Sequence, residues 1–309
     1  MEEKMTKLEK YWILYDVGNS AFILLTSTIL PIYFNELAGQ SGVSETDALA
    51  YWGYAVSIST ILVALAGPVL GTMADTRGYK KRIFAVFMTL GVLSCAALGL
   101  PLSWTGFLAV FVAARIGYSA SLIFYDAMLA DVTSDARMDQ ISSQGYAWGY
   151  IGSCIPFLIS LVLVLGREAV GLSAGFAMSA AMVLNAVWWF GLSVPLLKNY
   201  RQIHGTDRRS HGFRDSFARL ARIFGDVRGN KKVFLFLLAF FFYIDGVYTI
   251  IEMATAYGSA IGLDAGGLLT ALLVTQIVAF PCALLFGKLA GNYKNTTLIK
   301  ACIASYFCI

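Results

Sequence analysis

The sequence predicts an all-α protein that crosses a membrane several times, and three observations support this fold class. Hydrophobic residues make up 58% of the chain and charged residues only 14%, whereas soluble domains carry about 25% charged residues. Long intervals contain no Asp, Glu, Lys or Arg, and each can supply the roughly 20 residues that a helix needs to cross a bilayer. The basic residues, finally, gather in alternate connections between these intervals, as the positive-inside rule requires.

Eight complete spans are expected, six before a polar, basic stretch and two after it. They cover residues 11–34, 50–70, 83–101, 104–125, 146–165 and 172–197, then 233–253 and 265–287. We therefore divide the chain into a six-helix N-terminal half at residues 1–197, a basic linker at 198–232 and an incomplete C-terminal half at 233–309. A ninth span begins at Thr296, but a helix of the nine residues after Lys300 rises only about 13 Å. We expect from this that the chain is truncated.

The distribution of charge predicts the orientation of the chain. Of the 23 Lys and Arg residues, all but Arg115 and Arg167 fall on one side of the membrane if the N-terminus is cytoplasmic. The positive-inside rule therefore predicts an integral, multi-pass protein with a cytoplasmic N-terminus, surrounded by the lipid bilayer. The net charge of +4 then reflects topology, and no nucleic-acid partner is expected.

The basic linker contains a pattern of its own. Large apolar residues recur at helical spacing within it, at Phe213, Phe217, Leu220 and Phe224. The spacing predicts a short amphipathic helix that lies on the inner membrane surface or against the bundle.

A glycine-rich, charged motif connects the second and third spans. It comprises Gly71, Asp75, Arg77, Gly78, Lys80, Lys81 and Arg82. The glycines allow a tight turn, and the Asp75 carboxylate can accept hydrogen bonds from a helix N-terminus or an arginine. Such a contact can hold one face of a transporter shut; an ordinary anchored loop is the alternative. A second, weaker copy follows the eighth span, with Gly291 at the position of Asp75, and indicates parallel repeats.

Polar and charged side chains inside the apolar spans are the candidates for a solute-binding or ion-coupling site. Each is costly in a bilayer unless it faces a cavity or a partner. The candidates are Asp16, Asn19, Arg115, Tyr125, Asp126, Asp245, Tyr248 and Glu252. They can serve as substrate counter-charge, proton carrier or gating ion pair, and Asp245 and Glu252 are candidates for the coupling proton. The alternative is that they form structural salt bridges within the bundle.

The remaining motifs indicate packing and no enzyme chemistry. Gly145, Gly149 and Gly152 open the fifth span, and the first two have the small-x-x-x-small spacing that permits close helix packing. No phosphate-binding Gly-Lys-Ser/Thr loop is present. Both histidines, His204 and His211, lie in the linker. We therefore expect no enzymatic activity, no metal site and no cofactor.

Five strings of the sequence resemble one known family. They are YDVGNSAF at residues 15–22, ILPIYF at 29–34, FYDAMLADV at 124–132, GYAWGYIGS at 145–153 and FFFYIDGVYTIIEMA at 240–254. Together they resemble the vacuole effluxer-like branch of the major facilitator superfamily, which includes an autophagy-related amino-acid exporter. The resemblance implies a major facilitator fold, with a six-helix N-terminal half and the first two to three helices of the C-terminal half.

The expected function combines the candidate residues with this resemblance. We expect secondary active transport of a small polar solute by alternating access, coupled to an ion such as a proton. The resemblance implies amino-acid efflux. A monomer in a bacterial plasma membrane, or in a vacuolar membrane if the source is fungal, is expected. The alternative is a receptor or regulatory membrane protein that does not transport and acts through the linker helix.

Overall fold

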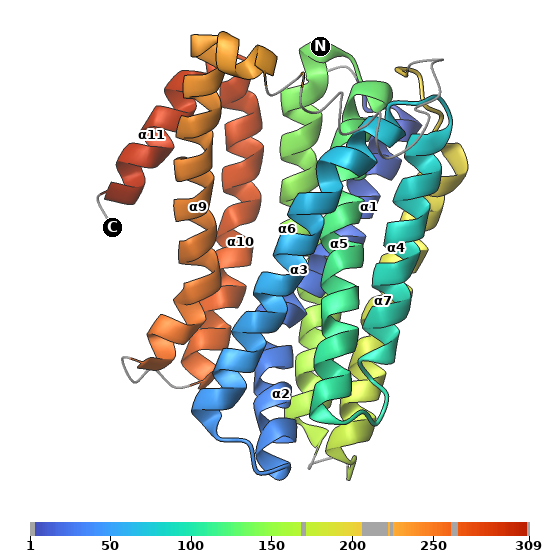
Figure 1. Cartoon of the computed structure of the whole chain (residues 1–309), viewed down its shortest axis with the longest axis vertical. Helices are drawn as coiled ribbons and strands as arrows, with labels where there is room; N and C mark the ends of the chain where they lie inside the picture. The colour runs from blue at the N-terminus through green and yellow to red at the C-terminus, as the bar shows by residue number, and fades with distance from the viewer. Residues whose placement is uncertain (1–3, 168–170, 206–221, 223–224, 261–264, 308–309) are drawn as a thin grey trace.

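The computed structural model describes residues 4–167, 171–205, 222, 225–260 and 265–307, and these residues form helices joined by turns, without a strand (Figure 1). The predicted all-α membrane fold is confirmed. The first group of helices is α1 (Lys7–Ser27), α2 (Ile29–Gln40), α3 (Glu45–Ala74), α4 (Tyr79–Ala97), α5 (Trp104–Val132), η1 (Asp135–Arg137), α6 (Met138–Leu165) and α7 (Ala174–Asn199). The second is α9 (Lys231–Ala260), α10 (Ala265–Ala290) and α11 (Asn295–Phe307).

The long helices run up and down, side by side (Figure 1). The chain's N-terminus, the turn from α3 to α4, the end of α7 and the turn from α10 to α11 all lie at the upper end in this view. Helix α1 packs against α6 and α7, and α5 packs against α3 and α4. Helix α10 packs along α6, whereas the described side chains of α9 are largely exposed.

Among the described residues, six helices are long and apolar enough to cross a membrane, and α1 with α2 forms a seventh span if the two count as one. The helix at the predicted third span, α4, runs beside α5 and α7. Its first turn carries Lys80, Lys81 and Arg82, so its apolar stretch is shorter than those of the other helices. From the second span on, each predicted span coincides with one helix, although α5 extends to Val132, α6 begins at Met138, α9 begins at Lys231 and α10 extends to Ala290.

The first predicted span requires a correction, because residues 11–34 do not form one continuous helix. Helices α1 and α2 meet at Thr28 with a bend of 40°. The hydroxyls of Thr26 and Ser27 both donate to the carbonyl of Ile23, at 2.8 and 2.9 Å, and such back-bonding bends helices. Pro31 has no N–H to donate to the preceding turn. The break therefore has a local cause that the apolar pattern conceals.

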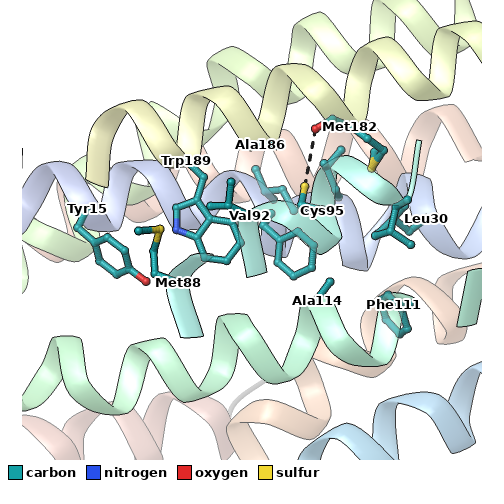
Figure 2. Close-up of a cluster of buried hydrophobic side chains, with 14 of the residues drawn as sticks. Tyr15, Leu30, Met88, Val92, Cys95, Phe111, Ala114, Met182, Ala186 and Trp189 are labelled. Carbon is teal, nitrogen blue, oxygen red and sulfur yellow. Dashed lines mark hydrogen bonds between the residues drawn. The ribbon is translucent and has the colours of Figure 1, made fainter. Parts of the chain in front are cut away.

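The core of the first group lies where α1, α4, α5 and α7 meet. Figure 2 shows Trp189 of α7 beside Val92 and Met88 of α4, with Tyr15 of α1 beyond them. The thiol of Cys95 donates to the carbonyl of Met182 at 3.8 Å. The close approach of α4 and α5 depends on glycine, since a Cβ atom added at Gly117 would lie 2.3 Å from the backbone nitrogen of Gly91.

Some of the sequence predictions fall outside the described residues. The predicted linker helix, with Phe213, Phe217, Leu220 and Phe224, is among them, and so is the side chain of Glu252.

Candidate functional site

A polar patch lies on α1 inside the otherwise apolar bundle. Asp16 is 8% exposed and Asn19 is 1% exposed. The amide nitrogen of Asn19 donates to the carbonyl of Tyr15 at 3.0 Å and lies 3.5 Å from Asp16 Oδ1. Among the described residues, no lysine, arginine or histidine forms an ion pair with Asp16. The structure thus holds a buried carboxylate whose hydrogen-bond partner is one amide.

The glycines at the start of α6 bring that helix directly onto this patch. A Cβ atom added at Gly149 would lie 2.9 Å from Ser20 Oγ and 3.1 Å from Asp16 Oδ2. One added at Gly152 would lie 2.4 Å from Val17 Cγ1. The absence of side chains at these positions lets the α6 backbone approach the polar groups of α1.

Tyr125 lies beside the same glycine face. Its ring stacks on Trp12, with centroids 4.2 Å apart and planes 12° apart, and Trp12 Nε1 donates to the carbonyl of Tyr125 at 3.0 Å. A Cβ atom added at Gly145 would lie 3.4 Å from Tyr125 Oη. That hydroxyl is buried and has no hydrogen-bond partner among the described residues. The Tyr15 hydroxyl, by contrast, is paired with Ser121 at 2.7 Å.

Electrostatic contacts connect further candidates to the patch. Asp126, which is exposed on α5, interacts with Asp16. Tyr118, Tyr146 and Tyr150 each interact with Asp16 and with Tyr248 of α9. The side chain of Tyr248 is 57% exposed.

The other two predicted candidates whose side chains are described lie on α5 and α9. Arg115 is half-buried on α5, with its Cζ 5.9 Å from the ring centroid of Phe111, and it interacts with Tyr118. Asp245 is exposed on α9. The candidates brought together are thus Asp16, Asn19, Tyr125 and Asp126.

The charged motif forms the turn between α3 and α4 at the upper end. Gly71 lies in the last turn of α3, and Asp75 ends that helix with its N–H bonded to the Gly71 carbonyl at 3.1 Å. Gly78 has φ +81°, a left-handed conformation that glycine adopts without strain. Arg77 and Arg82 are exposed, whereas Lys81 Nζ donates to the carbonyl of Tyr200 at 3.3 Å.

The buried carboxylate at this turn is Asp131, which we did not single out from the sequence. Its Oδ2 lies 2.9 Å from Lys80 Nζ and accepts from the Tyr200 hydroxyl. Its Oδ1 accepts from the backbone nitrogens of Ile203 and His204 at 3.1 and 2.7 Å. Lys80 also donates to the carbonyl of Ala127 at 3.1 Å.

Gln202 ties the same segment to the turn. Its Oε1 accepts from the N–H of Gly78 at 3.0 Å, and its Nε2 donates to the carbonyl of Ala74 at 3.0 Å. We call Lys80, Asp131, Tyr200, Gln202 and His204 the Asp131 network. One signal in the sequence could have indicated it: Asp131 lies at the same end of its helix as the basic motif, with the opposite charge.

Another carboxylate network fixes the start of α1. Glu9 closes a capping box with Thr6, whose backbone N–H lies 2.7 Å from Glu9 Oε2. Glu9 Oε2 also lies 3.2 Å from Arg137 Nη2, and Glu9 Oε1 accepts a hydrogen bond from the Thr133 hydroxyl at 2.6 Å. The N-terminus is thereby joined to the turn between α5 and α6.

Comparison with known proteins assigns this arrangement to a family. The sequence model of the family described as vacuole effluxer Atg22 like matches residues 45–137 and 130–309. The chain belongs to the vacuole effluxer Atg22-like family. The resemblance seen in the sequence is confirmed.

Two kinds of relative accompany this match. The Atg22-like chain is 40% identical to the uncharacterized MFS-type transporter YxiO of Bacillus subtilis (strain 168), over 100% of this chain and 73% of that protein. It is 24% identical to autophagy-related protein 22 from two strains of Cryptococcus neoformans, over 56% of this chain and 31% and 30% of those proteins. The chain is thus an integral, multi-pass membrane protein of a transporter family.

Proposed function

We propose that this Atg22-like protein is a secondary active transporter that moves a small polar solute by alternating access, coupled to an ion. The observation that carries the proposal is the Asp16 carboxylate, which is buried among apolar helices without a cationic partner among the described residues. An ionised side chain at the centre of a bilayer costs roughly 2.5–3.5 kcal/mol by insertion scales. A cation or proton that arrives during transport would offset this cost.

The packing of the two groups of helices supports the alternating part of the proposal. Helices α1 to α7 are held together at the upper end by the Asp131 network and by Glu9. Contact with the second group runs along α6, where Trp148 meets Phe280 with centroids 5.4 Å apart. At the upper end, Asn295 Nδ2 donates to Asp139 Oδ2 at 3.0 Å. Among the described residues, this contact runs mainly along one helix, and such an interface can open and close as two bodies rock.

The proposal also states the orientation of the protein, its solute and its membrane. The N-terminus and the Asp131 network face the cytoplasm, because the basic residues gather at this end. Amino acids are the solutes that the family resemblance implies, and the proton is the coupling ion. The protein works as a monomer. The relative in Bacillus subtilis supports a bacterial plasma membrane.

Counterflow in proteoliposomes tests this function without assuming a direction of transport. Vesicles that contain the purified chain and unlabelled amino acids are diluted into a labelled mixture, and an internal pH dye records proton movement. We expect labelled amino acids to accumulate with a change in internal pH, and Asp16→Asn to abolish both. Glu45→Gln, an exposed carboxylate at the opposite end of the bundle, should leave both unchanged. Absence of accumulation with folded wild-type protein, or equal accumulation by Asp16→Asn, contradicts the proposal.

A further inference from the structure

We infer that the polar patch of α1, α5 and α6 binds the protonated amine of a solute with net positive charge, with Asp16 and Asp126 as its counter-charges and the Tyr125 hydroxyl as an acceptor. This inference rests on the proposed function, because it names the class of solute that the transport site takes. It follows from three features: the sign of the charges, an unsatisfied buried hydroxyl and the aromatic side chains around them.

The charges of the patch favour a cation. Asp16 and Asp126 are close enough to interact, and neither forms an ion pair with a lysine, arginine or histidine among the described residues. Two neighbouring carboxylates repel each other, most strongly where water is scarce. A bound ammonium group relieves this repulsion, whereas a carboxylate of a solute would add to it. The Cζ of Arg115 lies 5.9 Å from the ring centroid of Phe111, and its guanidinium forms an ion pair with neither Asp16 nor Asp126.

The Tyr125 hydroxyl gives an independent indication of a ligand. Tyr125 is 3% exposed, and its Oη has no hydrogen-bond partner among the described residues. A buried hydroxyl without a partner is unfavourable, so a ligand that forms a hydrogen bond with it gains affinity. The hydroxyl lies beside Gly145, and the Asp16 carboxylate lies beside Gly149, one turn farther along the same glycine face of α6. Both oxygens therefore lie against the same face of α6, next to positions that are one helical turn, about 5–6 Å, apart.

An ammonium group has the chemistry that this arrangement needs. It offers three N–H donors and no acceptor, while the oxygens of Asp16 and Tyr125 both accept. Neighbouring rings add to the attraction, because a cation is drawn to the face of an aromatic ring. Tyr118, Tyr146 and Tyr150 all lie within electrostatic range of Asp16. A neutral or acidic solute would leave one of the two carboxylates without a counter-charge.

Binding to the purified chain in lipid nanodiscs tests the inference with three matched probes. L-Lysine, L-leucine and L-glutamate share the same α-amino and α-carboxylate groups and differ in net charge. We expect isothermal titration to detect L-lysine binding at least about tenfold tighter than L-leucine, and no binding of L-glutamate. Loss of a charge-assisted hydrogen bond should weaken L-lysine binding at least about tenfold in Asp16→Asn. Asp126→Asn changes an exposed side chain, so we expect this variant to fold and to bind L-lysine several-fold more weakly. It tests the inference even if Asp16→Asn fails to fold.

The outcomes separate this inference from the proposed function. Equal affinity for L-leucine and L-lysine, no L-lysine binding, or full affinity in both aspartate variants overturns the inference. If L-leucine is bound and also accumulates in proteoliposomes while L-lysine does not, the transport proposal stands and the cation preference falls. If L-lysine binds as expected while none of the three amino acids accumulates, the site stands and the transport proposal falls.

Discussion

Lys80 and Asp131 form a buried ion pair in which Nζ and Oδ2 are 2.9 Å apart and the side chains are 8% and 0% exposed. The pair joins the turn between α3 and α4 to the end of α5. Asp131 also accepts hydrogen bonds from Tyr200, Ile203 and His204. The first residues of the linker are thereby fixed to the first group of helices.

The two partners of this ion pair should differ in their importance for stability. Asp131→Asn leaves the buried Lys80 charge with its hydrogen bond to the Ala127 carbonyl but without a counter-charge from Asp131, and breaking a buried pair in this way costs about 3–5 kcal/mol. Lys80→Met leaves Asp131 with its other donors, so we expect a smaller fall in the midpoint of thermal unfolding in detergent. An equal or larger fall in Lys80→Met would contradict this assignment, and Glu45→Gln is the control.

Tyr200→Phe tests the contact between the linker and Asp131. Burial and the Asp131 carboxylate raise the pKa of the Tyr200 hydroxyl, so the hydroxyl stays protonated and donates at physiological pH. Loss of a hydrogen bond to a charged group costs about 1.5–3 kcal/mol, and the thermal midpoint should fall accordingly. Tyr293→Phe removes an exposed hydroxyl and should leave the midpoint unchanged. A Tyr200→Phe midpoint equal to wild type would show that the contact does not stabilise the fold.

Gly117→Ala tests the close packing of α4 and α5. Its Cβ atom would lie 2.3 Å from the Gly91 nitrogen and 2.8 Å from the Phe87 carbonyl oxygen, which are backbone atoms. Overpacking of this kind costs about 1–3 kcal/mol or more, so the yield of monodisperse protein and the thermal midpoint should both fall. Gly53→Ala, with nothing within 4 Å of the added atom, should be neutral or slightly stabilising. Normal yield of Gly117→Ala would refute this helix contact.

The sequence was sufficient to predict the helices and much of the polar patch. The thickness of the bilayer sets the length of each span. An aspartate inside such an apolar span stands out because a charged side chain is costly in the membrane. The break at Thr28 escaped prediction because a continuous apolar run conceals it, although Thr26, Ser27 and Pro31 mark the place.

The Asp131 network escaped prediction because it depends on tertiary contacts between distant segments. Lys80, Asp131 and residues 200–204 lie on separate elements, and no helical or strand periodicity relates them. The basic motif was interpreted through Asp75, which is exposed, whereas the buried carboxylate came from α5. Asp16 and Tyr125 likewise lie on separate helices, and they come near each other where Trp12 and Tyr15 of α1 pack against the Tyr125 ring of α5.

Cross-linking of the upper end tests most directly whether the two groups of helices move during transport. Asp139→Cys and Asn295→Cys place thiols at the contact between α6 and α11, in a background whose five native cysteines are replaced by alanine. A short bifunctional methanethiosulfonate should stop counterflow, and a reducing agent should restore it. The same reagent applied to Glu36→Cys and Arg167→Cys, within the first group, should leave counterflow intact. Undiminished counterflow with the first pair fully cross-linked would contradict alternating access at this contact.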